Sequence, residues 1–270
     1  MKRALLAFSG SDFSGGAFEF ARKINELAPI IAHGFFLPQI VTPVFEGVHS
    51  GIIEADKSQI NLTENTDRFT SLCEEHKITY SISRGDYTLP MPQLMKQTRY
   101  SDLLIAGSEV FFRSTSTENF ADYLREALHK SECPVVVVPE KFNFPENIVL
   151  AYDGSPSSVH AIKQFAYLFP ECCNKKLLLA YESKDATRQM PYEAEIRSLI
   201  ECHFPNVKYQ EFRSDRENNL NTWLAGQQDV IVVAGAADRT SLSELAKKSF
   251  ISELVSAHKI PVFLAHLQTT

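Results

Sequence analysis

Short apolar runs and longer amphipathic stretches alternate along the whole chain. Runs such as VVVV at 135–138 and VIVV at 230–233 are β-branched and contain no polar residue. Strands that are buried on both faces have this composition, whereas amphipathic stretches are typical of helices that cover a sheet. Strands that alternate with helices form parallel βαβ units with right-handed crossovers. The pattern therefore predicts an α/β fold built on doubly wound parallel sheets.

The predicted elements fall into two matching sets. Strands are expected at 3–8, 30–36, 78–83, 102–106 and 134–138, and again at 147–152, 176–181, 207–212, 229–234 and 261–265. Helices are expected at 12–27, 54–76, 88–98 and 117–130, and again at 156–169, 191–203, 216–226 and 242–258. Ligands of such sheets bind beyond the carboxyl ends of the strands, where the strand order reverses. The ends of the first and fourth strands of each set are therefore the expected places for a site.

The two sets correspond to an internal repeat. ALLAFSGS at 4–11 aligns with VLAYDGS at 149–155, SDLLIAG at 101–107 resembles QDVIVVAG at 228–235, and SECPVVVVP at 131–139 resembles AHKIPVFLAH at 257–266. The first copy is longer. Its extra length falls at 38–56, where two prolines and two glycines predict a loop. The stretch PEKFNFPEN at 139–147 interrupts the apolar pattern, so we predict one domain at 1–141 and a second at 142–270.

Charge and cysteine content narrow the class of function. The formal net charge is -6 and the lysines and arginines are scattered, which argues against a nucleic-acid partner. No apolar run approaches the length that crosses a bilayer, and the apolar stretch at 4–8 is too short for a secretory signal. The five cysteines form no C-x-x-C pair, which favours free thiols in the cytoplasm. The histidines form no H-x-x-x-H pair, so no metal site is predicted.

Two long stretches resemble a known family. IVLAYDGSPSSVHAIKQFA at 148–166 and DVIVVAGAADRTSLSELAKKSFISELVSAHKIPVFLAH at 229–266 resemble the universal stress protein family in its tandem two-domain form. The resemblance implies a five-stranded sheet of order 3-2-1-4-5 in each half, of the adenine-nucleotide alpha-hydrolase-like class. It also implies that the halves pair as the two subunits of a one-domain relative do, which makes protein partners or self-association expected.

One branch of that family binds ATP, and the resemblance implies which residues would do so here. Its marker is a glycine after strand four, a second glycine three residues on, and Gly-Ser or Gly-Thr after nine further residues, with an aspartate at the end of strand one. Glycines let the backbone approach phosphate oxygens closely. In the second copy Asp153, Gly235 and Ser249 match, whereas Asp238 and Lys248 replace the other two glycines. Asp238 would repel phosphates. Lys248 either reaches a phosphate as a point charge or is a solvated lysine.

The first copy departs further from the marker. Gly107 matches its first glycine, but Val110 and Phe120 replace the other two, Ala121 replaces the hydroxyl residue, and Ser9 replaces the aspartate. The expectation is therefore a stress-response protein that acts by binding or as a scaffold, without catalysis, through degenerate nucleotide sites. The alternative is a sensor of ATP or another adenine nucleotide, with magnesium, that uses only the second domain and binds through Asp153, Gly235, Lys248 and Ser249. A slow nucleotide hydrolase is a lesser alternative, because no base and nucleophile pair stands out.

Other motifs have local structural explanations. GSDFSGG at 10–16 has the glycine spacing of a P-loop, but Gly16 replaces its lysine. We expect a turn in which Ser11, Asp12 or Ser14 caps the first helix. Two hydroxyl-acid pairs fit capping boxes, Thr115 with Glu118 and Ser241 with Glu244, although an anion site at Arg113, Ser114 and Thr115 is an alternative for the first. We expect core packing for Cys73, Cys133, Trp223, Tyr152 and Phe8.

Overall fold

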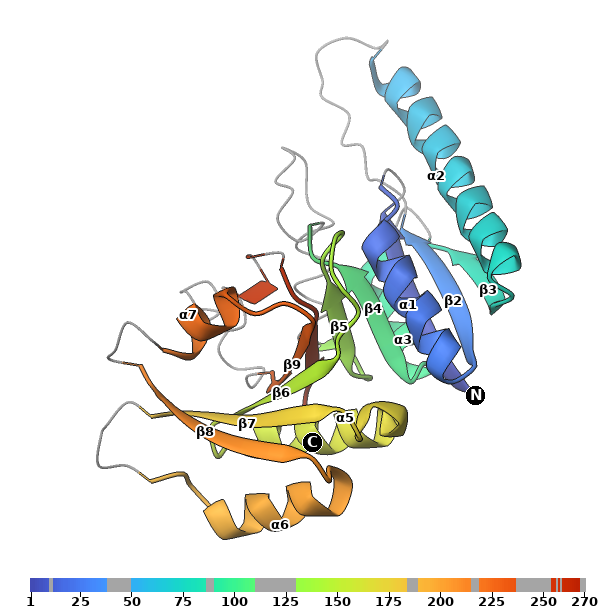
Figure 1. The fold of residues 1–270 in the computed structure, drawn as a ribbon. Helices are drawn as coiled ribbons and strands as arrows, with labels where there is room; N and C mark the ends of the chain where they lie inside the picture. Colours follow the sequence, from blue (N-terminus) through green and yellow to red (C-terminus); the bar gives the residue numbers. More distant parts are fainter. Residues whose placement is uncertain are drawn as a thin grey trace. The chain divides into compact units, whose positions relative to one another are not determined.

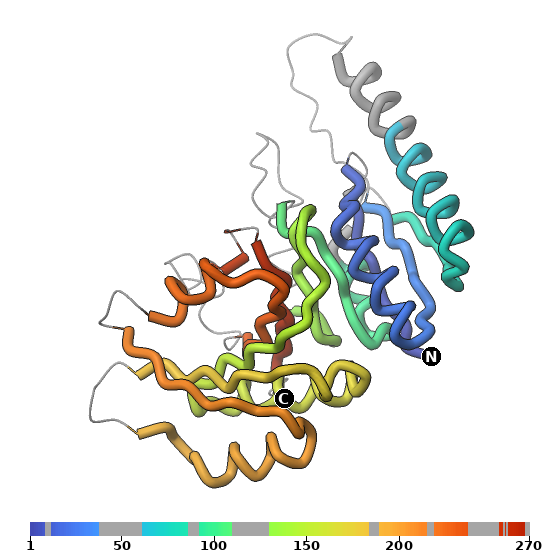
Figure 2. The backbone as a smooth tube through the Cα atoms, viewed as in Figure 1, coloured from blue at the N-terminus to red at the C-terminus, as the bar shows by residue number. Residues whose placement is uncertain are grey.

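A computed structural model gives the structure of the chain (Figures 1 and 2). The structure describes residues 1–9, 12–37, 50–85, 90–109, 130–183, 189–214, 219–236, 254–255, 257 and 259–267. For Ser9 and for residues 50–60 and 90–91 it describes the backbone alone. The chain divides into two compact units, Met1–Cys133 and Pro134–Thr270. No described helix has both the length and the apolar content that a membrane span requires.

Unit 1 is a parallel sheet with helices between its strands. In chain order its elements are β1 (Lys2–Ser9), α1 (Gly15–Leu27), β2 (Ile30–Leu37), α2 (Ser50–Glu75), β3 (Thr79–Arg84), α3 (Pro90–Arg99) and β4 (Leu103–Gly107). The strand order is β3-β2-β1-β4. The register pairs Lys2 with Ile30 and Ala4 with Leu103. Both pairings are parallel, so β1 and β4 end at the same edge of the sheet.

Unit 2 repeats this arrangement and adds two strands. Its elements are β5 (Val135–Val138), β6 (Asn147–Tyr152), α5 (Pro156–Leu168), the 3-10 turn η2 (Pro170–Cys172), β7 (Lys176–Ser183), α6 (Glu193–His203), β8 (Val207–Arg213), α7 (Leu220–Ala225), β9 (Val230–Gly235) and β10 (Val262–Ala265). The parallel order β8-β7-β6-β9-β10 confirms the predicted order 3-2-1-4-5 for the second copy. β5 pairs antiparallel with the other edge of β10, with Val137 opposite Val262.

Buried strands and aromatic rings form the cores. The four residues of β5 and the four of β10 are all buried, as their unbroken apolar composition predicts. In unit 1 the ring of Phe69, from α2, lies 5.7 Å from Phe8 and 5.9 Å from Phe36. Phe18, from α1, lies 6.0 Å from Phe69, so both helices pack on the same face of the sheet. Edge-to-face pairs of this kind add stability beyond the area that they bury.

A buried histidine interrupts the apolar surface of β2. His33 is only 5% exposed, and its ring nitrogens lie 2.7 Å from Ser81 Oγ and 2.9 Å from Ser83 Oγ on β3. Burial, together with the positive charge of Arg3, lowers the pKa of His33 from 6.5 to about 4. The ring is therefore neutral at pH 7, and its two hydrogen bonds compensate for the loss of contact with water.

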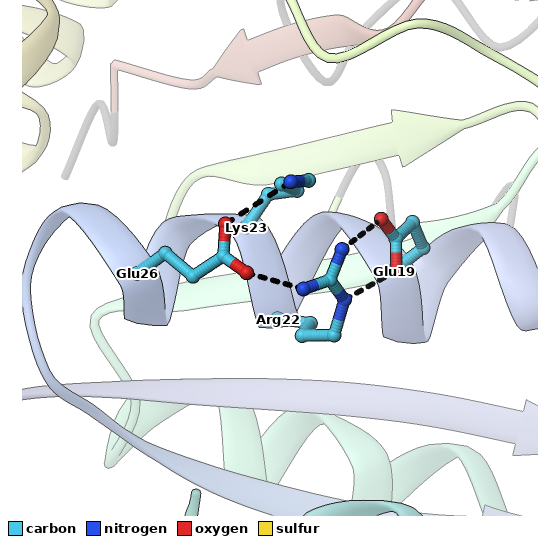
Figure 3. A network of polar contacts seen from close by, with 4 residues as sticks. All are labelled: Glu19, Arg22, Lys23 and Glu26. Carbon is cyan, nitrogen blue, oxygen red and sulfur yellow. Dashed lines mark hydrogen bonds and ion pairs between the residues drawn. The ribbon is translucent and has the colours of Figure 1, made fainter. Parts of the chain in front are cut away.

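Helix α1 illustrates how local sequence fixes an element. Ser14 is its N-cap, and its hydroxyl accepts a hydrogen bond from the backbone N–H of Ala17 at 3.2 Å, which confirms one of the three predicted caps. On the outer side, Arg22 pairs with Glu19 at 2.6 Å and also with Glu26 (Figure 3). The hydrogen bond from Arg22 lowers the pKa of Glu19. Such i,i+3 and i,i+4 pairs on a helix surface stabilise it slightly.

The predicted loop at 38–56 is wrong in its last part, because α2 begins at Ser50. Both prolines that suggested a loop precede this residue, and Gly51 falls in the first turn, where a glycine costs a helix less than in its interior. Residues 38–49 lie outside the described residues, as do 117–129 and most of 242–258, where two helices are predicted. The domain boundary near residue 141 stays a prediction.

Candidate functional site

The carboxyl edge of unit 2 brings two predicted site residues together. β6 ends at Tyr152 and β9 ends at Gly235, and these strands are parallel neighbours with Ala151 opposite Ala234. Asp153 follows directly after β6 and therefore lies beside the end of β9. This is the position where doubly wound sheets hold their ligands.

The turn after β6 uses Asp153 as a structural acceptor. Asp153 Oδ1 accepts a hydrogen bond from the backbone N–H of Ser155 at 2.8 Å, and Gly154 between them has a φ of 82° that favours glycine. Ser155 then caps α5, because its hydroxyl accepts from the backbone N–H of Ser158 at 3.1 Å. The turn thus connects strand to helix with local bonds alone, and the exposed carboxylate of Asp153 still reaches solvent.

Gly235 lies directly against the first turn of α5. A Cβ atom at Gly235 would lie 2.5 Å from the backbone nitrogen of Ser158 and 2.7 Å from the carbonyl oxygen of Ser157. Real Cβ contacts of that length essentially never occur, and backbone atoms cannot rotate away. The packing of helix against strand therefore explains this glycine without any phosphate.

The rest of the predicted nucleotide marker lies outside the described residues. This holds for Asp238, Lys248 and Ser249 in the second copy, and their binding role stays a prediction. In the first copy Gly107 ends the buried strand β4, but Val110, Phe120 and Ala121 are outside the described part. The capping boxes and the alternative anion site at Arg113, Ser114 and Thr115 are outside it too.

A cleft that the sequence analysis missed lies in unit 2, and we call it the α5–α6 cleft. Its volume is about 670 Å³, within the range of small-molecule sites. It is lined by Tyr152, Gly154, Ser155, Pro156, Val159, His160, Lys163, Tyr192, Glu195, Ile196, Leu199 and Leu267. Asp153 and Gly235 are absent from this lining. The spacing of Val159, His160 and Lys163 shows from the sequence that they share one face of a helix. It does not show which second helix that face meets.

Burial shifts the pKa values of two ionisable groups that line this cleft. Tyr152 is 3% exposed, and its hydroxyl donates a hydrogen bond to the carbonyl oxygen of Pro191 at 2.8 Å. Burial, and next the charge of Asp153, raise the pKa of Tyr152. Burial, and next the charge of Lys163, lower the pKa of His160, so this imidazole is neutral at pH 7.

The described side chains offer little for nucleophilic or metal chemistry. Burial raises the pKa of Cys73 and of Cys133 to about 12, so both are packing residues as predicted. Within the described residues, no group of three or more His, Cys, Asp or Glu side chains could hold a metal ion. Phe8 and Tyr152 are buried as expected, whereas Trp223 is only half-buried, with its ring 5.4 Å from Phe212.

Comparison with known proteins relates the fold to solved structures. No family model and no curated protein matches the sequence. A universal stress protein from Archaeoglobus fulgidus DSM 4304 matches with a TM-score of 0.72 and 14% identity, over 98% of this chain and 96% of that one. A candidate universal stress protein from Pseudomonas aeruginosa UCBPP-PA14 matches with a TM-score of 0.54 and 14% identity, over 98% of this chain and 93% of that one.

A third structure, a protein of unknown function from Pseudomonas aeruginosa PAO1, matches with a TM-score of 0.55 and 14% identity, over 98% of this chain and 92% of that one. The matches span nearly the whole chain, so they include both units. The chain therefore has the fold of the universal stress proteins, which confirms the fold that the resemblance implied. Matches at identities this low establish the fold and give no further information about the site.

Proposed function

We propose that this chain is a cytoplasmic stress-response protein of the universal stress protein kind, which acts by binding and carries out no reaction. The observation that supports this proposal is the carboxyl edge of unit 2. There Asp153 and Gly235 stand in the positions that the family marker gives them, yet each has a structural task in this chain. The turn engages the carboxylate of Asp153, and α5 occupies the space next to Gly235. We infer a nucleotide site that has degenerated while its scaffold persists.

Binding without catalysis makes protein partners, or a second copy of the chain, the expected ligands. The raised pKa values of the buried cysteines agree with this, because a thiol that stays protonated is a poor nucleophile. Native mass spectrometry of the purified chain, before and after addition of millimolar ATP and magnesium, tests the proposal. We expect no nucleotide adduct. One bound nucleotide per chain would contradict it and would support the second candidate.

The second candidate is a nucleotide sensor that uses only unit 2. It is favoured by the position of Asp153, whose exposed carboxylate lies beside the end of β9, where the marker places it. This candidate predicts that Asp153→Ala abolishes ATP binding. Asp153→Asn keeps the acceptor for Ser155, so it separates loss of the charge from loss of the turn. Glu201→Ala, which removes an exposed carboxylate from α6, is the matched control. Unchanged affinity in Asp153→Ala would exclude the sensor.

A slow nucleotide hydrolase is the lesser alternative. This candidate predicts that the purified chain releases phosphate from ATP above the level of a boiled control. It also predicts that Asp153→Ala loses this release. At the carboxyl edge of unit 2 the hydrogen bonds of Tyr152, Asp153 and Ser155 serve the turn and the helix cap, which does not favour a nucleophile and base pair there.

A further inference from the structure

The α5–α6 cleft is built from two helix stripes of the same spacing. Pro156, Val159, His160 and Lys163 lie at i, i+3, i+4 and i+7 on α5, and Tyr192, Glu195, Ile196 and Leu199 lie at the same spacing at the start of α6 and along it. Residues at this spacing share one face of a helix. The two lining faces therefore turn towards one another, and each supplies apolar side chains and polar ones.

Contacts at both ends give this cleft a defined shape. At the carboxyl ends of the helices the rings of Tyr167 and His203, one turn beyond Lys163 and Leu199, lie 5.5 Å apart, so the two helices are in contact there. At the amino ends the turn at Gly154 packs tightly on Pro191, because a Cβ at Gly154 would lie 2.8 Å from Pro191 Cβ. The hydroxyl of Tyr152 holds the same proline through its carbonyl. Helix contact at one end and a fixed turn at the other favour a compact ligand over an extended peptide.

The walls combine apolar surface with an exposed aromatic ring. Val159, Ile196 and Leu199 form apolar surface, and Tyr192 offers a ring that is 69% exposed. Tyr192 has a φ of 51°, a conformation that is uncommon for a large side chain and that clusters at functional sites. An exposed aromatic ring that shares a cleft with apolar surface is favourable for stacking with a planar ligand.

The two walls of the cleft carry charged side chains of opposite sign. Lys163 places an ammonium group on the α5 wall, and the neutral imidazole of His160 beside it offers one donor and one acceptor. On the α6 wall, Glu195 carries a carboxylate. An anionic group on a ligand is therefore expected at the α5 wall, next to the ammonium group of Lys163.

We propose that the α5–α6 cleft binds a small planar aromatic molecule with one anionic group, whose ring lies between the two helix stripes and whose anion faces Lys163. This site goes beyond the function proposed above. Asp153 and Gly235 do not line it, and it requires no nucleotide and no partner protein.

The test uses 8-anilinonaphthalene-1-sulfonate as the probe, because this dye combines a planar aromatic body with one sulfonate. Isothermal titration of the full chain should show one saturable site. Lys163→Ala should weaken binding about fivefold, the effect of losing an exposed charge pair. Tyr192→Ala should weaken it about threefold to tenfold through loss of the stacked ring. Val159→Phe should weaken binding, because the larger ring projects into the space between the two stripes.

Two variants in unit 1 serve as matched controls. Lys96→Ala and Tyr100→Ala remove an exposed lysine and an exposed tyrosine that do not line the cleft, and both should bind the dye as the unmodified chain does. The emission of Trp223 and the far-ultraviolet circular dichroism confirm that each variant is folded. The proposal is overturned if the unmodified chain shows no saturable site, or if Lys163→Ala and Val159→Phe bind within twofold of it. Since ATP binding is measured separately, failure here leaves the proposed function intact, and the reverse also holds.

Discussion

Replacement of Gly235 by alanine tests the close approach between β9 and α5 in unit 2. The added Cβ would lie 2.5 Å from Ser158 N and 2.7 Å from Ser157 O, about 1 Å inside ordinary contact. β9 is paired on both sides, with β6 and with β10, so α5 must move instead. Its residues Ala161 and Ile162 are fully buried. Overpacking of this kind costs about 1–3 kcal/mol, and contact with backbone atoms places the effect near 3 kcal/mol.

Urea unfolding followed by tryptophan fluorescence measures this cost in unit 2 specifically. The chain has one tryptophan, Trp223, which lies on α7 with its ring 5.4 Å from Phe212. With a slope of about 2 kcal/mol per M, a loss of 3 kcal/mol lowers the midpoint of unfolding by about 1.5 M. This change should be seen with little change in the slope.

Gly226→Ala is the matched control for this experiment. Gly226 also lies in unit 2, but its φ is -92° and a Cβ there would lie 3.6 Å from its nearest neighbour, which is ordinary contact. The control should be neutral or should gain up to about 1 kcal/mol from a less flexible unfolded chain. If Gly235→Ala and Gly226→Ala unfold at the same urea concentration, the packing explanation for Gly235 is refuted.

Three further predictions concern single side chains. The pKa of His33 falls from 6.5 to about 4 on folding, so the unfolded chain binds the proton first and stability is lost as the pH drops below about 6.5, by about 2 kcal/mol at pH 5. Calorimetry at pH 7.5 and pH 5 should show this loss, and His33→Gln should remove most of it; an equal loss in the variant would contradict the assignment. Iodoacetamide at pH 8 should modify the exposed Cys202 alone in the folded chain, because burial keeps thiols such as that of Cys73 protonated, and a second adduct in the intact mass would disagree. Tyr152→Phe should destabilise unit 2 by about 1 kcal/mol through loss of its buried hydrogen bond, whereas Tyr167→Phe, at an exposed site, should have no effect on the Trp223 transition.

The elements of the fold could be predicted because their signals are local. The strand predicted at 147–152 is found at those residues, and Ser14 caps α1, since apolar runs and capping hydroxyls act within a few residues. The start of α2 at Ser50 was missed because Gly51 resembles a loop residue when its helical neighbours are unknown. The pairing of β5 with β10 was not predicted, because an unbroken run of valines indicates a buried strand without naming its neighbour or its direction.

The candidate site was less predictable, because it depends on contacts between distant segments. The sequence placed Asp153 and Gly235 at strand ends, and the register of β6 and β9 confirms that they are neighbours. It could not show that α5 leaves no space beside Gly235, or that Tyr167 meets His203. The α5–α6 cleft follows from which two helices are adjacent, and a pattern along one helix does not contain that information.

The pairing of β5 with β10 has a consequence for how unit 2 folds during synthesis and how its edge is protected. β5 is the first strand of unit 2 in sequence and β10 is the last, so Val135 meets Leu264 from almost the opposite end of the unit. During synthesis β5 leaves the ribosome early and must wait for nearly the whole unit before its partner arrives, a non-local contact of the kind that slows folding. Without β5, the apolar strand β10 would present an unpaired edge, which is a template for aggregation. β5 thus covers an edge of unit 2 that would otherwise be open to pairing with another chain.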